Sequence, residues 1–268
     1  MNVLIWTDME GISGITVLEQ ILPEHFLYAE GRQLYTEDIN AAARGAVAAG
    51  AKRIVVREAH GGHAVLGVNH VIPELLDASC DWVSHHYGPA QPWLDIPYDA
   101  CVMVGMHARW GTPDGILCHT IQGGMDIYLN ERPVGEIEVF ARMLGAFGIP
   151  VVAVTGDTAT CAEACEVIPG VTTVAVKQGY TSTSGLCIAP KRARAMIQAE
   201  VCNALQTMPT QPLLPVEPAV WRVKYHMPEI AGRMAMLPDV KQVAEDEIVI
   251  EAASYSTGLN RIFGWPNP

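Results

Sequence analysis

Short runs of apolar residues alternate along most of the chain with longer stretches that have helical periodicity. The apolar runs stop at polar or glycine-containing turns and predict strands at Val3–Trp6, Arg53–Val56, Trp82–Ser84, Ala100–Val104, Val151–Val154 and Thr173–Val176. The stretches between them end near glycine, proline or polar breaks and predict helices at Gly31–Ala49, Glu136–Phe147, Thr158–Val167 and Pro190–Thr207. This alternation is typical of an α/β fold, so we expect a three-layer sheet with helices on both faces.

A proline-rich connector divides the chain into two regions. The stretch "MPTQPLLPVEP", from Met208 to Pro218, contains four prolines and predicts a stiff segment. We therefore expect an α/β domain at 1–207 and a small α+β appendage at 208–268. The appendage contains strand patterns at Val220–Tyr225 and Glu247–Glu251 and a short helical pattern near Ile230–Met236. Within the first region, "YLNERPVG" (Tyr128–Gly135) predicts a hairpin with an Asn-Glu turn.

Composition and charge exclude several classes of protein. Half of the 268 residues are hydrophobic and 17% are charged, which favours a packed core over disorder. The net charge of −12 argues against a nucleic-acid partner, which usually requires a basic patch. No signal peptide and no apolar run of about 18 residues is evident, so we expect no membrane partner. The seven cysteines are scattered without Cys-x-x-Cys pairs, which favours reduced thiols in a cytoplasmic protein.

Carboxylates and imidazoles follow three of the predicted strands. The polar residues after these strands are Asp8 and Glu10, then Glu58, His60 and His63, and finally His107, Arg109 and His119. Ligands of open α/β sheets bind beyond the carboxyl ends of strands, and residues two apart on an extended chain point to the same side. Two carboxylates held this close repel each other unless a cation lies between them. We therefore expect a metal site, with an ordinary acidic turn as the alternative for the first pair.

Other polar residues have simpler interpretations. Glu136 opens a helical pattern, where an acid is favoured by the helix dipole alone. Cys118 adjoins a histidine, but neighbouring residues on an extended segment point to opposite sides, which argues against a cysteine nucleophile. Lys177 ends an apolar strand and is expected to pair with an acid rather than to bind a substrate carboxylate. Asp157 is expected to cap the following helix. The adjacent His85 and His86 are expected at the surface.

Several motifs together resemble the zinc-dependent D-aminopeptidase family. They occur in the family's order as "DMEGISG", "AH" after the second strand, "GMHAR", "GTP", "CHT" and "NERPVGE". The resemblance extends from about Met1 to Thr207 and includes the later "VTGD" and "VTTVAVKQG". It departs from the family where Glu58-Ala59 replaces the usual Asp-Ser before the histidine of the second strand. The resemblance implies a two-zinc site with the ligands Asp8, Glu10, His60, His107 and Glu136, and a catalytic role for His119.

The chemistry of these residues agrees with a metal cluster. Three carboxylates and two neutral imidazoles offset most of the charge of two divalent ions. Mixed oxygen and nitrogen ligands suit Zn²⁺, and also Mn²⁺ or Co²⁺. Five side chains for two metals indicate at least one bridging carboxylate, and Asp8 and Glu10 are both candidates.

The resemblance implies a metal-dependent aminopeptidase that hydrolyses short peptides with an N-terminal D-amino acid. Two metals would lower the pKa of a water molecule between them, and His119 would act as the general acid/base or stabilise the oxyanion. The family also implies a homo-oligomer, which we expect to be a ring-shaped decamer. Two alternatives remain open. One is a metal-dependent amidase acting on another small amide or a cell-wall-derived peptide, and the other is a non-catalytic binding protein on the same fold.

Overall fold

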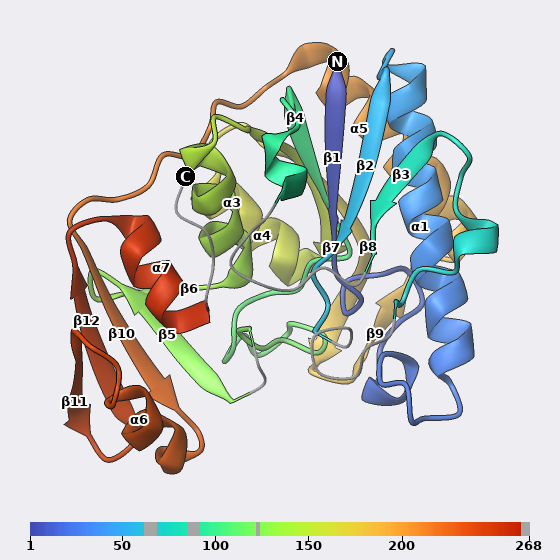
Figure 1. The fold of residues 1–268 in the computed structure, drawn as a ribbon. Helices are drawn as coiled ribbons and strands as arrows, with labels where there is room; N and C mark the ends of the chain where they lie inside the picture. Colours follow the sequence, from blue (N-terminus) through green and yellow to red (C-terminus); the bar gives the residue numbers. More distant parts are fainter. Residues whose placement is uncertain (62–68, 85–91, 122–123, 264–268) are drawn as a thin grey trace.

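The computed structural model describes residues 1–61, 69–84, 92–121 and 124–263 (Figure 1). Its main sheet has seven strands in the order β3-β2-β1-β4-β7-β8-β9. These strands are β1 (Asn2–Thr7), β2 (Arg53–Glu58), β3 (Cys80–Val83), β4 (Ala100–Val104), β7 (Val151–Asp157), β8 (Thr172–Thr181) and β9 (Ser184–Cys187). Neighbouring strands are parallel from β3 to β8, and β9 pairs antiparallel with β8.

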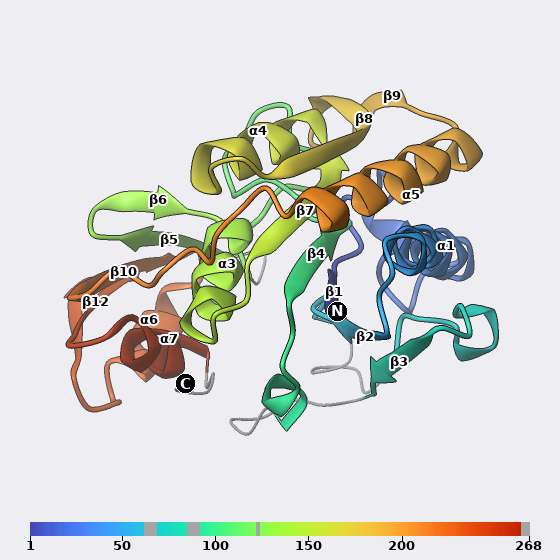
Figure 2. The ribbon, with the colours of Figure 1, turned by 90° about the horizontal axis from the view of Figure 1, so that it is seen from above.

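Helices cover both faces of this sheet (Figure 2). They are α1 (Tyr28–Ala48) and α5 (Pro190–Thr207) on one face and α3 (Glu136–Ala146) and α4 (Thr158–Val167) on the other. Side chains of β1 alternate between the faces, with Val3 and Ile5 in the cluster that contains α1 and α5. Trp6 points the other way, and its ring lies 4.8 Å from that of Phe140 in α3. The three-layer α/β sheet predicted from the sequence is therefore confirmed.

A second, antiparallel sheet of five strands lies beside α3 (Figure 1). Its strands, in spatial order, are β11 (Val240–Ala244), β12 (Glu247–Ala252), β10 (Ala219–Tyr225), β5 (Met125–Leu129) and β6 (Arg132–Val134). Two short helices, α6 (Pro228–Met234) and α7 (Tyr255–Phe263), lie against it. The hydroxyl of Tyr255 in α7 donates to the carbonyl of Val139 in α3 at 2.9 Å, which ties this sheet to the main body.

The second sheet combines strands from both regions that the sequence suggested. The predicted hairpin is β5–β6, and its turn residues Asn130 and Glu131 have positive φ angles of 48° and 65°. On its other edge, β5 pairs with β10, in a register that runs from Trp221 opposite Leu129 to Tyr225 opposite Met125. The division into an α/β domain at 1–207 and an appendage at 208–268 remains a prediction.

The strand order places a ligand-binding edge beside β1. The chain adds β2 and β3 on one side of β1 and then β4 and β7 on the other, so β1 and β4 flank a topological switch point. Loops that follow parallel strands diverge at such a point and leave room for a ligand. Across the four described ranges, no helix is long and apolar enough to cross a membrane.

Candidate metal centre

The loops that follow β1 and β4 lie against each other. The backbone N–H of Asp8 donates to the carbonyl of Val104, and that of Gly11 donates to the carbonyl of Gly105, both at 2.8 Å. A Cβ atom on Gly11 would lie 1.8 Å from the carbonyl oxygen of Met106. Gly105 has φ +75°, and a Cβ there would lie 2.2 Å from the carbonyl oxygen of Asp8. The two glycines are therefore required for the close approach of these loops.

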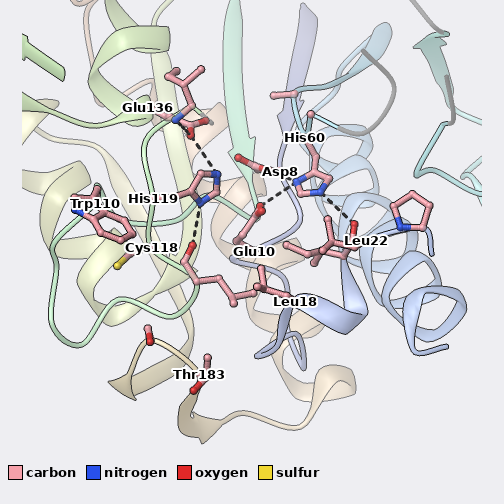
Figure 3. A pocket seen from close by; sticks show the side chains of 17 residues that line it. Asp8, Glu10, Leu18, Leu22, His60, Trp110, Cys118, His119, Glu136 and Thr183 are labelled. Carbon is pink, nitrogen blue, oxygen red and sulfur yellow. Dashed lines mark hydrogen bonds and ion pairs between the residues drawn. The ribbon is translucent and has the colours of Figure 1, made fainter. Parts of the chain in front are cut away.

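Asp8, Glu10 and His60 form the first of two groups of side chains that could hold a metal ion (Figure 3). The Nδ1 atom of His60 lies 3.2 Å from one carboxylate oxygen of Asp8 and 3.2 Å from one of Glu10. Its Nε2 atom lies 3.3 Å from the carbonyl oxygen of Ile21, to which it donates. Histidines that bind metals typically donate their second N–H in this way. The lone pair of Nδ1 therefore points at two carboxylates, an arrangement that requires a cation or a proton between them.

His107, His119 and Glu136 form the second group, from the loop after β4 and the first turn of α3. The Nε2 atom of His107 is buried and makes no hydrogen bond among the described residues. It lies 3.2 Å from Oε1 of Glu136 and 3.4 Å from Oδ2 of Asp8. Its Nδ1 atom lies 3.0 Å from the carbonyl oxygen of Ala108, so one nitrogen of each ring contacts a backbone carbonyl, as Nε2 of His60 does. Asp8 thus presents Oδ1 to one group and Oδ2 to the other.

The two groups hold strongly coupled charges. Burial alone would lower the pKa of His60 and of His107, but the carboxylates around each ring outweigh it and raise both pKa values well above the usual value. Burial also disfavours the charged form of Asp8, yet its two histidine neighbours hold its pKa well below the usual range. The nitrogen atoms therefore have a high affinity for cations, and a divalent metal would compete with protons for them. The donor set of oxygen and nitrogen fits zinc.

A cavity of about 540 Å³ opens over both groups (Figure 3). One wall is the segment after β1, and the other is the loop between β4 and β5. The apolar residues of these walls are Leu18, Ile21, Leu22 and Pro23 on one side and Trp110, Leu117 and Ile121 on the other. The side chain of His119 is 21% exposed against 6% for Glu136, so His119 faces the cavity more openly than the carboxylate behind it.

The structure brings together all six residues that the resemblance singled out. Glu136 is the least expected member from sequence alone, because it comes from the first turn of α3. Its Oε1 atom also accepts the N–H of Ile121 at 2.6 Å, which orients the carboxylate toward the histidines. The rings of His107 and His119 stack with their centroids 3.9 Å apart. The roles of these residues as ligands and catalyst remain predictions.

Two candidates from the same strand ends do not join the centre. Glu58 accepts the backbone N–H groups of His70 and Val71 at 2.7 and 3.2 Å. Its carboxylate therefore fixes these two residues, which lie between β2 and β3. Arg109 lies 3.7 and 3.8 Å from carboxylate oxygens of Glu163 and Glu166 of α4. His63, His85 and His86 lie outside the described residues.

Asp157 and Lys177 act on the backbone of the loops around the centre. Asp157 caps α4 by accepting the N–H of Thr160 at 2.7 Å, as predicted, and it also accepts the N–H of Ile116 at 2.7 Å. The prediction that Lys177 pairs with an acid was wrong, because its Nζ atom donates to three backbone carbonyls. Sequence reasoning also missed the apolar walls of the cavity, since Leu18–Pro23 belongs to no periodic pattern.

The carboxylates and imidazoles lie together at the switch point of a parallel sheet, beneath an open cavity. This arrangement is typical of an α/β protein with metal-dependent chemistry. Residues 1–262 match the sequence model of peptidase family M55, described as D-aminopeptidase. The chain belongs to this D-aminopeptidase family, which confirms the predicted enzyme class.

Two relatives support the assignment. A D-aminopeptidase of Bacillus subtilis is 32% identical over 231 residues, which cover 81% of this chain and 81% of the relative. The solved structure of the Zn-dependent D-aminopeptidase DppA from Bacillus subtilis, described as a self-compartmentalizing protease, superposes with a TM-score of 0.87. That match has 27% sequence identity and covers 98% of this chain and 97% of DppA.

Proposed function

We propose that this chain is a two-zinc aminopeptidase that removes D-amino acids from the N-terminus of short peptides. The observation that carries the proposal is the position of Asp8, whose two carboxylate oxygens face two separate groups of ligands. Two metal ions, when bound, lower the pKa of a water molecule and polarise the carbonyl of the scissile amide. Zinc is the metal named for the structural relative, and Mn²⁺ or Co²⁺ would suit the same donors.

The distances suggest which side chains hold each ion. Asp8, Glu10 and His60 would hold the first ion, and Asp8, His107 and Glu136 would hold the second. Of the two candidates for the bridging carboxylate, Asp8 is favoured, because its Oδ2 atom lies 3.4 Å from Nε2 of His107, whereas Glu10 makes its histidine contact with His60 at 3.2 Å. The carbonyl oxygens of Ile21 and Ala108, which accept from the second ring nitrogens of His60 and His107, would fix the orientation of the two imidazoles.

His119 would move the protons of the reaction. Its Nδ1 atom lies 3.0 Å from the carbonyl oxygen of Leu117 and donates to it, which leaves Nε2 as the exchanging atom. Nε2 lies 3.7 Å from Oε1 of Glu136 and faces the cavity. From there the imidazole would take a proton from the attacking water and give it to the leaving amine. The carboxylate of Glu136 would stabilise the imidazolium between these two steps.

The shape of the cavity supports a short peptide as substrate, with its amine and scissile amide over the ligand groups and its side chain against an apolar wall. A wall that is closed on one side of Cα selects one enantiomer by steric exclusion. Because the structural relative is a self-compartmentalizing protease, we also propose a ring-shaped homo-oligomer, a decamer in its simplest form. The seven free cysteines of the chain support the further proposal that it works in the cytoplasm.

Protein purified without chelators is expected to contain about two divalent metal ions per chain, since each ligand group would hold one ion. Elemental analysis of the purified protein, normalised to protein concentration, measures this number. Some metal could be lost during purification, so the control is a zinc titration of protein that has been stripped of metal with a chelator. If stripped protein rebinds no metal, the proposed centre is wrong.

Paired dipeptides that differ only in the handedness of an N-terminal alanine test the substrate class. At equal metal loading, we expect kcat/KM for D-Ala dipeptides to exceed that for the L-isomers by at least about tenfold, because a single steric clash in the transition state costs more than ~1.4 kcal/mol. Preference for the L-isomer would overturn the D-specific assignment and leave a metal-dependent aminopeptidase. Cleavage of neither dipeptide by metal-loaded protein would favour the alternative of an amidase acting on a different amide.

A further inference from the structure

The side chain of Lys177 crosses from β8 to the loop that carries two of the proposed ligands. Lys177 is only 2% exposed, although it carries an ammonium group. Its Nζ atom donates to the carbonyl oxygens of Glu10, Ile12 and Ile15, the second of these at 3.0 Å. In the sheet, β8 is separated from β1 by β4 and β7, so this contact joins segments that are far apart in both sequence and sheet order.

The three contacts use the full hydrogen-bonding capacity of the ammonium group. A lysine has three N–H donors and no acceptor, and each donor here has a backbone carbonyl. Three carbonyl oxygens that converge on one point would repel one another without a cation between them. Burial lowers the pKa of Lys177 to about 8, against the opposing effect of acids such as Asp157 and Asp38.

The other contacts of the loop reach α1 and the loop after β4. Ser13 donates through its backbone N–H and its hydroxyl to the carboxylate of Asp38 in α1, both at 2.8 Å. The described backbone hydrogen bonds of the loop include the bond from Gly11 to Gly105 at 2.8 Å and two turn bonds of 3.2 Å, from Ile12 to Met9 and from Ile15 to Ile12. The turn bonds connect the loop only to itself. Among the described hydrogen bonds, Lys177 is the main-sheet side chain that binds this turn, and it does so at three carbonyl oxygens.

We propose that Lys177 is a positioning residue for the metal centre. By holding the carbonyl of Glu10 and the turn that follows, it fixes the backbone from which the Glu10 carboxylate reaches His60. Its hydrogen bonds all go to backbone carbonyls, and none of them reaches a ligand side chain. The role rests on the metal site of the proposed function, but it is independent of the peptide that the enzyme cleaves.

Lys177→Met tests this role, because methionine has a similar length but neither charge nor donors. We expect the variant to bind zinc at least about tenfold more weakly than the wild type, which is the scale of losing a group that orients a metal ligand. Competition with a chromophoric chelator measures the affinity without any substrate. The absorption spectrum of the Co²⁺-loaded variant is expected to differ from that of the wild type, since it reports the ligand geometry.

Two control variants separate positioning from general stability. Lys191→Met removes an exposed lysine at the start of α5 and is expected to change nothing. Val201→Ala removes buried side-chain volume between α5 and α1 and is expected to lower the melting temperature while leaving zinc affinity intact. Zinc affinity that falls in Lys177→Met but not in Val201→Ala assigns the effect to the loop.

Lys177→Gln is the second variant, because its amide keeps two donors on a shorter side chain. We expect it to bind zinc with an affinity between those of Lys177→Met and the wild type. Unchanged zinc affinity in both variants would overturn the proposal. Failure of both to fold would also overturn it, because Lys177 would then support the whole sheet rather than one loop. If the wild type cleaves no D-peptide but Lys177→Met still loses zinc affinity, the positioning role stands and the proposed substrate falls.

Discussion

Replacement of His119 by alanine is expected to lower kcat by roughly 10²–10⁴-fold while the metal content stays unchanged. This range of rate loss is typical of removing a general acid/base, and the position of the His119 side chain supports that role. Nε2 of His119 faces the cavity, its other nitrogen donates to a backbone carbonyl, and its ring stacks on that of His107. Proton transfer would be lost, whereas five oxygen and nitrogen ligands would remain.

Turnover and metal content must be measured on the same preparation to test this. Cys118→Ser is the matched control, because Cys118 is the neighbouring residue and lines the same cavity. We expect it to retain most of the activity, since its thiol lies 3.3 Å from the carbonyl of Thr112 and not against a proposed ligand. Loss of one metal equivalent in His119→Ala would make His119 a ligand. A larger loss in Cys118→Ser would favour the cysteine nucleophile that the sequence argued against.

Much of the main sheet was predictable because its strands are buried on both faces. Apolar runs such as Ala100–Val104 contain no residue that must face water, so they are recognisable from composition alone. The short or polar elements were missed. β11 is almost wholly exposed and contains Lys241 and Gln242, so it shows neither an apolar run nor clear alternation. β9 is four residues long and was missed for the same reason.

The pairing of distant segments could not be predicted from the sequence. The hairpin β5–β6 was recognised from its turn, but nothing in its sequence indicates that its free edge pairs with β10, about 90 residues later. Local patterns encode the elements and their faces, whereas the order of strands in a sheet is a property of the whole chain.

The site was predictable to the extent that its residues follow strands. Asp8, His60 and His107 each come shortly after an apolar run, and parallel strands bring such residues to one edge. Glu136 has no such signal, and only the resemblance to a family indicated it. Lys177 was misassigned because its partners are backbone carbonyls, which every sequence contains, and no pattern shows which of them a loop will expose.

Replacement of Asp8 by asparagine is expected to weaken both metal sites, whereas replacement of Glu136 by glutamine is expected to weaken one. Both changes keep the size of the side chain and remove a charge. Asp8 presents one oxygen to His60 at 3.2 Å and the other to His107 at 3.4 Å, so its charge would be shared by two ions. Glu136, in contrast, lies 3.2 Å from His107 and 3.7 Å from His119, both in the second group.

The expected losses of metal affinity follow from the number of ions that each carboxylate would bind. Loss of groups that merely orient ligands costs 10–100-fold in metal affinity, so loss of a shared ligand charge in Asp8→Asn should exceed about 100-fold and reduce turnover to that of chelator-treated enzyme. Glu136→Gln should lower the affinity for one ion by at least about tenfold. If Glu136 were only an acid in the first turn of α3, the change would cost a few tenths of a kcal/mol of stability and leave metal binding intact.

Zinc titration followed by calorimetry would separate the two variants, because it gives both the number of sites and the affinity of each. The wild type should bind about two ions per chain, Glu136→Gln one ion tightly and one weakly, and Asp8→Asn neither tightly. Thermal unfolding of the metal-free proteins is the control, since a variant that unfolds early would lose both sites for an unrelated reason. One tight site remaining in Asp8→Asn would show that Asp8 does not bridge, and Glu10 would then have to supply the shared oxygen atoms. That result would still leave a two-metal centre, but it would be built around the carboxylate whose backbone Lys177 holds.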